Sequence, residues 1–167
     1  MNTGQMLLSL GPLILLSFLT LRINSNQLTT QDIMQNSKFG ILAVSVASSF
    51  IEEATEKAFD ENGLENFITS LSTLTAKSDF GPENGENPDS SYTFDDFDDY
   101  DGYTTEISNI PSAVFDVACT VDYVDPDVQG FITTSKTWHK QLVVRVTSPS
   151  MRDTIEMTKI FSYWKFP

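Results

Sequence analysis

The chain has 167 residues, enough for one domain and an appendage, and its formal net charge is −13. This charge repels phosphate backbones, which are bound through clustered Lys and Arg, so no nucleic acid partner is expected. Cys119 is the only cysteine, which excludes an intrachain disulfide and a paired-cysteine metal site. Its neighbours alternate between apolar and polar, so a buried, inert thiol is expected.

The first element is an uncharged apolar run from Met1 to Leu21. No basic residue precedes Arg22 and no small-residue cleavage pattern follows the run, so a cleaved secretion signal is not favoured. The run is just long enough to cross a bilayer core, which requires roughly 20 apolar residues. Because proline lacks an amide donor, a spanning helix is expected to be kinked at Gly11-Pro12.

Apolar residues then recur at helical spacing, which predicts an amphipathic helix over residues 31–60. The link 24–30 contains no proline or glycine, so the two segments either form one rod or meet through a short extended link. Residues 1–60 are therefore interpreted as a helical stalk, apolar over 1–22. A small domain cannot bury such a rod, so its apolar half is expected in lipid or against identical rods.

Residues 61–112 are acidic and rich in Gly, Pro, Asn and Asp, which is typical of a loop-rich insert. The region 113–167 alternates apolar and polar residues in three stretches separated by turn residues, which predicts three or four antiparallel strands. One face of this sheet is expected to pack on the amphipathic helix. The predicted fold class is therefore α+β, with one globular domain.

An uncharged N-terminal helix, its amphipathic continuation and an acidic β-rich domain together resemble the type IV pilin superfamily, which includes minor pilins and type II secretion pseudopilins. Two local stretches are also similar to minor pilins: "FDDFDDYDGY", Phe94 to Tyr103, and the C-terminal segment Lys140 to Trp164. The resemblance implies a pilin-like fold in which the apolar half of the helix protrudes and the amphipathic half packs on the sheet.

It also implies a structural subunit, not an enzyme, that waits in the cytoplasmic membrane as a membrane-inserted precursor. Export and assembly machinery would then place it in a homopolymeric helical filament at the cell surface, where it contacts copies of itself through the apolar helix. The family usually has Glu at the fifth helix position. Here Gln5 can hydrogen-bond a neighbour's terminal amine without neutralising it. Gly11 and Pro12 resemble residues that let a pilin rod partly unwind, so these three are the candidate assembly residues.

One constellation suggests a ligand, and it is a cluster of acidic residues: Asp95, Asp96, Asp98, Asp99 and Asp101. Crowded carboxylates suit Ca²⁺, which takes six to eight oxygen ligands, and gathering them without a cation is costly. The spacing is not that of an EF-hand. The simpler interpretation is a solvated acidic loop, and no cofactor other than Ca²⁺ is suggested.

Aromatic residues recur at every third position of this loop, at Phe94, Phe97 and Tyr100. This spacing predicts that they anchor the loop to the sheet as one helical turn.

The sequence offers no pattern of a nucleophile and a base around its only histidine, His139, so an enzyme is not expected. The alternative to a filament subunit is a monomeric membrane-anchored extracellular module that binds calcium or a glycan. Aromatic residues near the C-terminus could form a sugar-binding face, although such residues on strands more often cover a core or an edge. They are Trp138, Tyr163 and Trp164.

Overall fold

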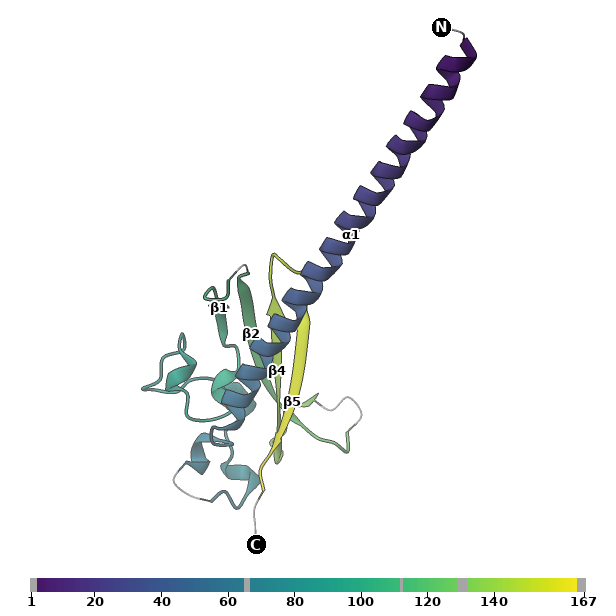
Figure 1. Cartoon of the computed structure of the whole chain (residues 1–167). Coiled ribbons are helices and arrows are strands. Elements are labelled where there is room, and N and C mark those ends of the chain that lie inside the picture. The colour runs from purple at the N-terminus through teal and green to yellow at the C-terminus, as the bar shows by residue number, and fades with distance from the viewer. Residues whose placement is uncertain (1–2, 65–66, 112, 129–131, 165–167) are drawn as a thin grey trace. The chain divides into compact units, whose positions relative to one another are not determined.

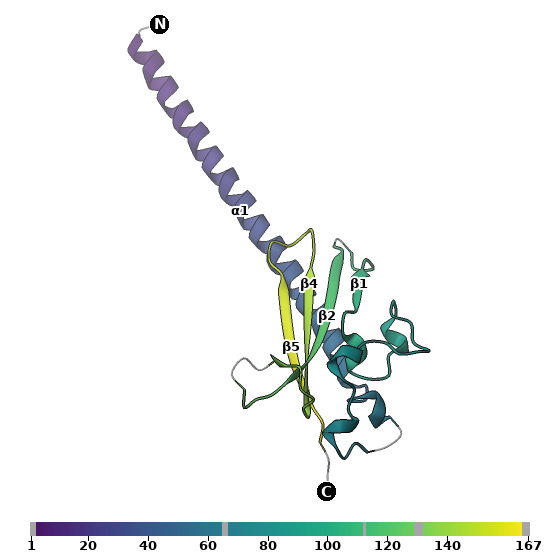
Figure 2. The same ribbon diagram turned by 180° about the vertical axis from the view of Figure 1, so that it is seen from behind.

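The structure is a computed structural model that describes every residue except 1–2, 65–66, 112, 129–131 and 165–167, and the side chains of Leu7 and Ser9. It combines one long helix, α1 (Thr3–Thr55), with a small antiparallel sheet, and so confirms the predicted α+β class (Figures 1 and 2). The chain divides into two compact units, residues 1–38 and 39–167, and the boundary falls within α1. The two units are described separately.

In the first unit, α1 is continuous through Gly11-Pro12 and through the link 24–30, so the apolar and amphipathic segments belong to one helix (Figure 1). Every described side chain from Thr3 to Gln35 is exposed. By length and composition this part of α1 meets the criteria for a membrane anchor and equally for a signal sequence.

In the second unit, the remaining turns of α1 pack on the sheet. Buried residues recur at intervals of three and four along this part of the helix, as a core-facing stripe requires: they are Phe39, Ala43, Val46, Ala47, Phe50 and Ala54. The helix ends at Thr55, earlier than the pattern up to residue 60 predicted, because the chain turns and Ala58 N–H donates to the Asp95 carbonyl at 3.1 Å.

The sheet has the strand order β1-β2-β4-β5, with β3 paired to the free part of β2, and every pairing is antiparallel. The three long strands match the three predicted stretches: β2 (Phe115–Val124), β4 (His139–Thr147) and β5 (Ile155–Ser162). Two short strands were not predicted, β1 (Thr104–Ile107) and β3 (Ile132–Thr133). β1 starts inside the stretch interpreted as loop, where its four residues add an edge strand to β2.

The predicted alternation places one face of β2 and β4 in the core and leaves the other face more exposed. Inward-facing residues lie opposite one another across the two strands: Val117 and Val146, Cys119 and Val144, and Val121 and Leu142. Burial, together with the nearby Glu53 charge, raises the pKa of the Cys119 thiol to about 12. The expectation of a buried thiol is confirmed, and its raised pKa favours the low reactivity that was also expected.

Along the chain between α1 and β1, the described residues form five short 3₁₀ turns: Glu61–Gly63, Leu71–Thr73, Lys77–Asp79, Ser91–Thr93 and Asp98–Tyr100. The insert over 61–112 is therefore rich in loops, as expected, but much of it is packed. A second apolar cluster joins its first half to the sheet through Phe59, Ile68, Leu74 and Tyr123.

Replacing Phe50 with Ala should lower the free energy of unfolding by about 3 to 5 kcal/mol, because it leaves a cavity between helix and sheet. Phe50 is 8% exposed and its ring lies 6.2 Å from that of Tyr103. Urea unfolding of the full chain in detergent, followed by tryptophan fluorescence, measures the change. Ile41→Ala is the matched control, because Ile41 is 69% exposed on the same helix. Equal losses in the two variants would contradict this packing.

Candidate functional site

The acidic loop is held against the core by its aromatic residues, as the spacing predicted, but the three do not share one helical turn, because only Tyr100 lies in the 3₁₀ turn Asp98–Tyr100. Phe94, Phe97 and Tyr100 are all buried, and the last of them ends a 3₁₀ turn. The Phe97 ring lies 5.1 Å from that of Phe161 on β5, and the Phe94 ring lies 5.1 Å from that of Tyr100. The loop is therefore a fixed part of the core.

The same packing buries the carboxylates between these rings. Asp96, Asp98 and Asp99 are at most 1% exposed, whereas Asp95 is exposed and Asp101 is half-buried. The interpretation as a solvated acidic loop is therefore wrong for the central three. It failed because the rings at every third position draw the intervening backbone, and its carboxylates, into the interior.

Asp98 faces a buried lysine. Lys140 is 0% exposed, and its Nζ contacts Asp98 Oδ1 and lies 3.0 Å from Asp60 Oδ2. It also donates to the Phe59 carbonyl at 2.7 Å. The rings of Phe59, Phe80 and Tyr123 surround the ammonium group, with centroids 4.7, 5.0 and 5.6 Å away. One cation thus balances carboxylates from two distant segments.

The two carboxylates respond differently to this lysine. Burial alone would raise the pKa of Asp60, but the Lys140 charge and a hydrogen bond from Thr75 N–H outweigh burial and hold that pKa below its usual value. For Asp98, burial prevails and raises the pKa despite the nearby ammonium group. Asp60 is therefore the firmly ionised partner of Lys140.

Asp101 has a different cation. Its Oδ2 lies 2.7 Å from Lys77 Nζ, which is also 3.2 Å from Asp122 Oδ1, and its Oδ1 accepts from Val121 N–H at 2.9 Å. The five aspartates of the sequence cluster therefore do not converge on one point. Asp98 and Asp101 are each neutralised by a lysine.

Asp96 and Asp99 organise the loop backbone. Asp96 Oδ1 accepts from the N–H groups of Asp98 and Asp99 at 2.8 and 3.2 Å, and Asp99 Oδ2 accepts from those of Asp95 and Asp96, both at 3.0 Å. The second oxygens, Asp96 Oδ2 and Asp99 Oδ1, are buried and have no hydrogen-bond partner. Each carboxylate thus has one oxygen committed to structure and one available.

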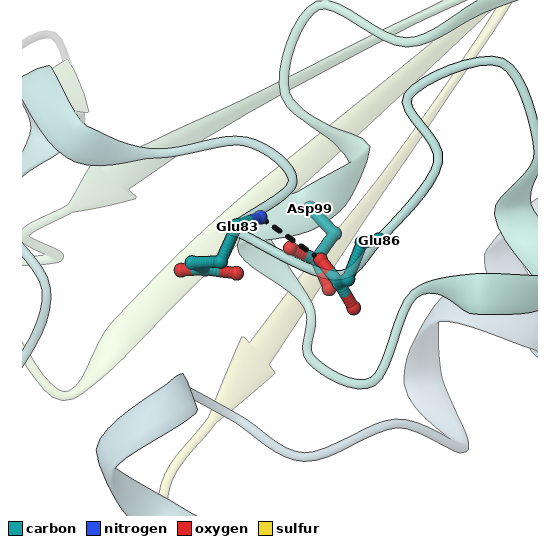
Figure 3. A group of neighbouring side chains, drawn as sticks. All are labelled: Glu83, Glu86 and Asp99. Carbon is teal, nitrogen blue, oxygen red and sulfur yellow. Dashed lines mark hydrogen bonds between the residues drawn. The ribbon is translucent and has the colours of Figure 1, made fainter.

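Two glutamates from the preceding loop approach Asp99. Glu83, Glu86 and Asp99 each offer an oxygen, and these oxygens all lie within 4.8 Å of one another (Figure 3). Glu86 is held by two backbone donors, Glu83 N–H to Oε2 and Asp95 N–H to Oε1, both at 3.1 Å. Burial, then the charge of Asp99, raises the pKa of Glu83 to about 8. This carboxylate cluster, Glu83, Glu86 and Asp99, has the chemistry of a site for a hard cation.

Sequence reasoning missed the two glutamates. They stand three residues apart around Gly85, in a stretch whose composition indicated only a loop. Gly85 has φ of 120°, in the region that favours glycine, and this conformation turns the chain between the two carboxylates. A pair of acidic residues flanking such a turn was the available signal, but nothing in the sequence placed it beside Asp99.

The aromatic residues near the C-terminus form a separate feature. Trp138 and Tyr163 stack with ring centroids 5.6 Å apart, and both line a pocket of about 410 Å³ together with His139, Ser162 and Trp164. His139 Nδ1 lies 2.7 Å from Ser162 Oγ.

The three candidate assembly residues, Gln5, Gly11 and Pro12, are exposed along α1 in the first unit.

Replacing Lys140 with Met should cost about 3 to 5 kcal/mol of stability, because Asp60 and Asp98 stay buried without their cation. Urea unfolding of the full chain in detergent measures this loss. Lys159→Met, an exposed lysine on β5, should change little. Combining Lys140→Met with Asp60→Asn and Asp98→Asn should recover most of the loss. A triple variant as unstable as the single one would exclude this electrostatic explanation.

Asp96 gives a pH prediction. Burial, then the charge of Asp98, raises the pKa of Asp96 from 3.8 to about 9. The folded state holds this proton more tightly than the unfolded chain does. The stabilisation that the proton adds to the free energy of unfolding is therefore fully present below pH 4 and is lost as pH rises towards 9. In EDTA, Asp96→Asn should be more stable than the parent at pH 9, by on the order of 1 to 3 kcal/mol, and nearly equal at pH 4. Asp116→Asn, on the exposed face of β2, is the control and should show no such difference.

In comparisons with known proteins, no family model, curated protein or solved structure matches this chain. Its function is therefore inferred from its own residues.

Proposed function

We propose that the chain is a structural subunit of a type IV pilus-like extracellular filament, which assembles through the apolar part of α1. One observation carries the proposal: the helix begins with about 20 uncharged residues, and its described side chains in this part bury nothing within the protein. The second unit, residues 39–167, has its own core and does not need this segment for its packing.

The exposed apolar surface of the first unit is large. Its big side chains are between 48% and 77% exposed: Met6, Leu8, Leu10, Leu13, Ile14, Leu15, Leu16, Phe18, Leu19, Leu21, Ile23 and Leu28. Water does not tolerate a surface of this kind on a free molecule. Lipid tails or the same helix from other copies would cover it, and moving from lipid to a bundle adds helix packing.

The polar side chains of this segment suit an environment without water. Ser17 Oγ donates to the Leu13 carbonyl at 2.8 Å, and Thr20 Oγ1 donates to the Leu16 carbonyl at 2.9 Å. Each hydroxyl is thereby satisfied within its own helix. These two hydroxyls therefore need no outside partner and put the helix at little disadvantage in lipid or in a bundle core.

The decisive experiment is negative-stain microscopy of material sheared from the surface of cells that produce the chain, with the subunit identified by mass spectrometry. Filaments built of this chain, with residues 3–21 retained, are expected. Filaments of another protein, or a surface form that lacks the apolar segment, would overturn the proposal.

Gly11→Leu tests the assembly contact without disturbing the subunit. A Cβ at Gly11 would meet nothing within 4 Å, so a larger side chain can be added without a clash at its first atom, and leucine also suits a helix better than glycine. If copies pack closely at this position, filaments should fall at least about tenfold while membrane insertion persists, since leucine is apolar. Leu10→Met, a volume-conserving change one residue earlier, is the control. Undiminished filament yield in Gly11→Leu would remove Gly11 from the interface.

A second candidate function is a monomeric, membrane-anchored extracellular module that binds a glycan. The stacked Trp138 and Tyr163 rings beside a pocket favour it, because sugars pack on aromatic faces. This function predicts detergent-extracted monomers, no filaments on the cell surface and glycan binding that Trp138→Ala abolishes.

A further inference from the structure

We propose that Glu83, Glu86 and Asp99 bind a calcium ion that ties the loop between Gly81 and Thr93 to the buried acidic loop. The site lies entirely within the second unit, so it does not depend on whether the chain forms filaments.

The spacing of the three carboxylates fits one ion. Their candidate oxygens all lie within 4.8 Å of one another. Two oxygens that bind the same Ca²⁺ at 2.3 to 2.6 Å can be at most about 5 Å apart. The pairwise spacing is therefore compatible with one shared ion, which small side-chain movements would bring into contact with all three carboxylates.

The burial of Asp99 is the second, independent observation. Its side chain is 1% exposed, and its Oδ1 is buried without a hydrogen-bond partner, while Oδ2 is fixed by two backbone N–H groups. Glu83 Oε2 is also buried without a partner. Unpartnered carboxylate oxygens in the interior are costly, and a cation between them would satisfy both.

The nearby lysines are committed elsewhere. Lys140 contacts Asp60 and Asp98, and Lys77 contacts Asp101 and Asp122. Lys57 Nζ donates to the Phe94 carbonyl at 2.6 Å. Among the described residues, no ion pair involves Glu83, Glu86 or Asp99. Within the described part of the chain, the negative charge of these three carboxylates is therefore met by backbone N–H groups but by no cationic side chain.

The ligand atoms indicate which ion. The cluster offers only oxygen, since Cys119 is buried in the core and the only histidine hydrogen-bonds Ser162, which argues against zinc. The carboxylates come from an irregular loop and a single 3₁₀ turn. Calcium tolerates such irregular sites, whereas magnesium requires near-ideal octahedral geometry.

The competing occupant is a proton shared between carboxylates, because the same crowding raises the pKa of Glu83 to about 8. The two possibilities differ in their response to added metal. A proton-linked cluster gains nothing from calcium at fixed pH, whereas a calcium site releases protons and stabilises the fold as the ion binds.

The experiment uses the full chain in detergent, stripped of metal, at pH 7.5 and 150 mM NaCl. Titration calorimetry with CaCl₂ is expected to give saturable binding with a Kd of about 1 mM or tighter, and MgCl₂ should bind at least about tenfold more weakly. Thermal unfolding should shift upward by several degrees with 5 mM CaCl₂ relative to EDTA. No heat and no shift would show that protons suffice and would overturn the proposal.

The variant Glu83→Gln should lose most of the calcium response while remaining folded. In EDTA it should be at least as stable as the parent, since it removes repulsion with Asp99 and leaves in place the two backbone hydrogen bonds that Glu86 accepts, and this separates loss of a site from misfolding. Asp89→Asn is the matched control, because Asp89 is an exposed acidic residue of the same loop. It should keep the full response. Equal loss in the control would indicate diffuse attraction to an acidic protein and would also overturn the proposal.

Discussion

The buried ammonium group of Lys140 is the interaction on which the second unit depends. It joins the segment that follows α1, through Phe59 and Asp60, to the acidic loop, through Asp98, and to strand β4, on which it lies. In sequence, Asp60 lies 80 residues and Asp98 lies 42 residues before Lys140. A salt bridge in the interior gains little over apolar packing, but breaking it leaves uncompensated charge. Lys140 therefore favours one arrangement of three segments over the alternatives.

Contacts between residues far apart in sequence, such as those of Lys140, explain which parts of the fold could be predicted from the sequence and which could not. Local periodicity was sufficient for the amphipathic part of α1 and for the three long strands, because the alternation of Phe115, Val117, Cys119 and Val121 reports directly which face is buried. It left open whether the link 24–30 is helical, and the structure shows that it is. It was insufficient for β1, where four residues follow a loop and only pairing with β2 makes them a strand. The early end of α1 is also set from outside, by the bond between Ala58 and Asp95.

For the acidic loop, too, one property was predictable from the sequence and another was not. The spacing of the three aromatic residues correctly predicted that the loop is anchored, but composition wrongly suggested that its carboxylates are solvated. The alternation along β4 indicated that carboxylates must be buried, since it places Lys140 on the same inward face as Leu142 and Val144. A lysine at an inward position requires buried carboxylates somewhere in the fold. Which carboxylates these are, and that Glu83 and Glu86 meet Asp99, follows only from tertiary structure.

Cys119 has a practical consequence. Its thiol is enclosed by the sheet and is almost entirely un-ionised at neutral pH, so it is a poor target for maleimides and disulfide reagents. A cysteine introduced in the exposed part of α1, between Thr3 and Gln35, would be the one thiol that reacts readily. Single-site fluorophores, spin labels or crosslinkers can therefore be attached without first mutating the native residue, and crosslinks between copies can be mapped residue by residue along the helix.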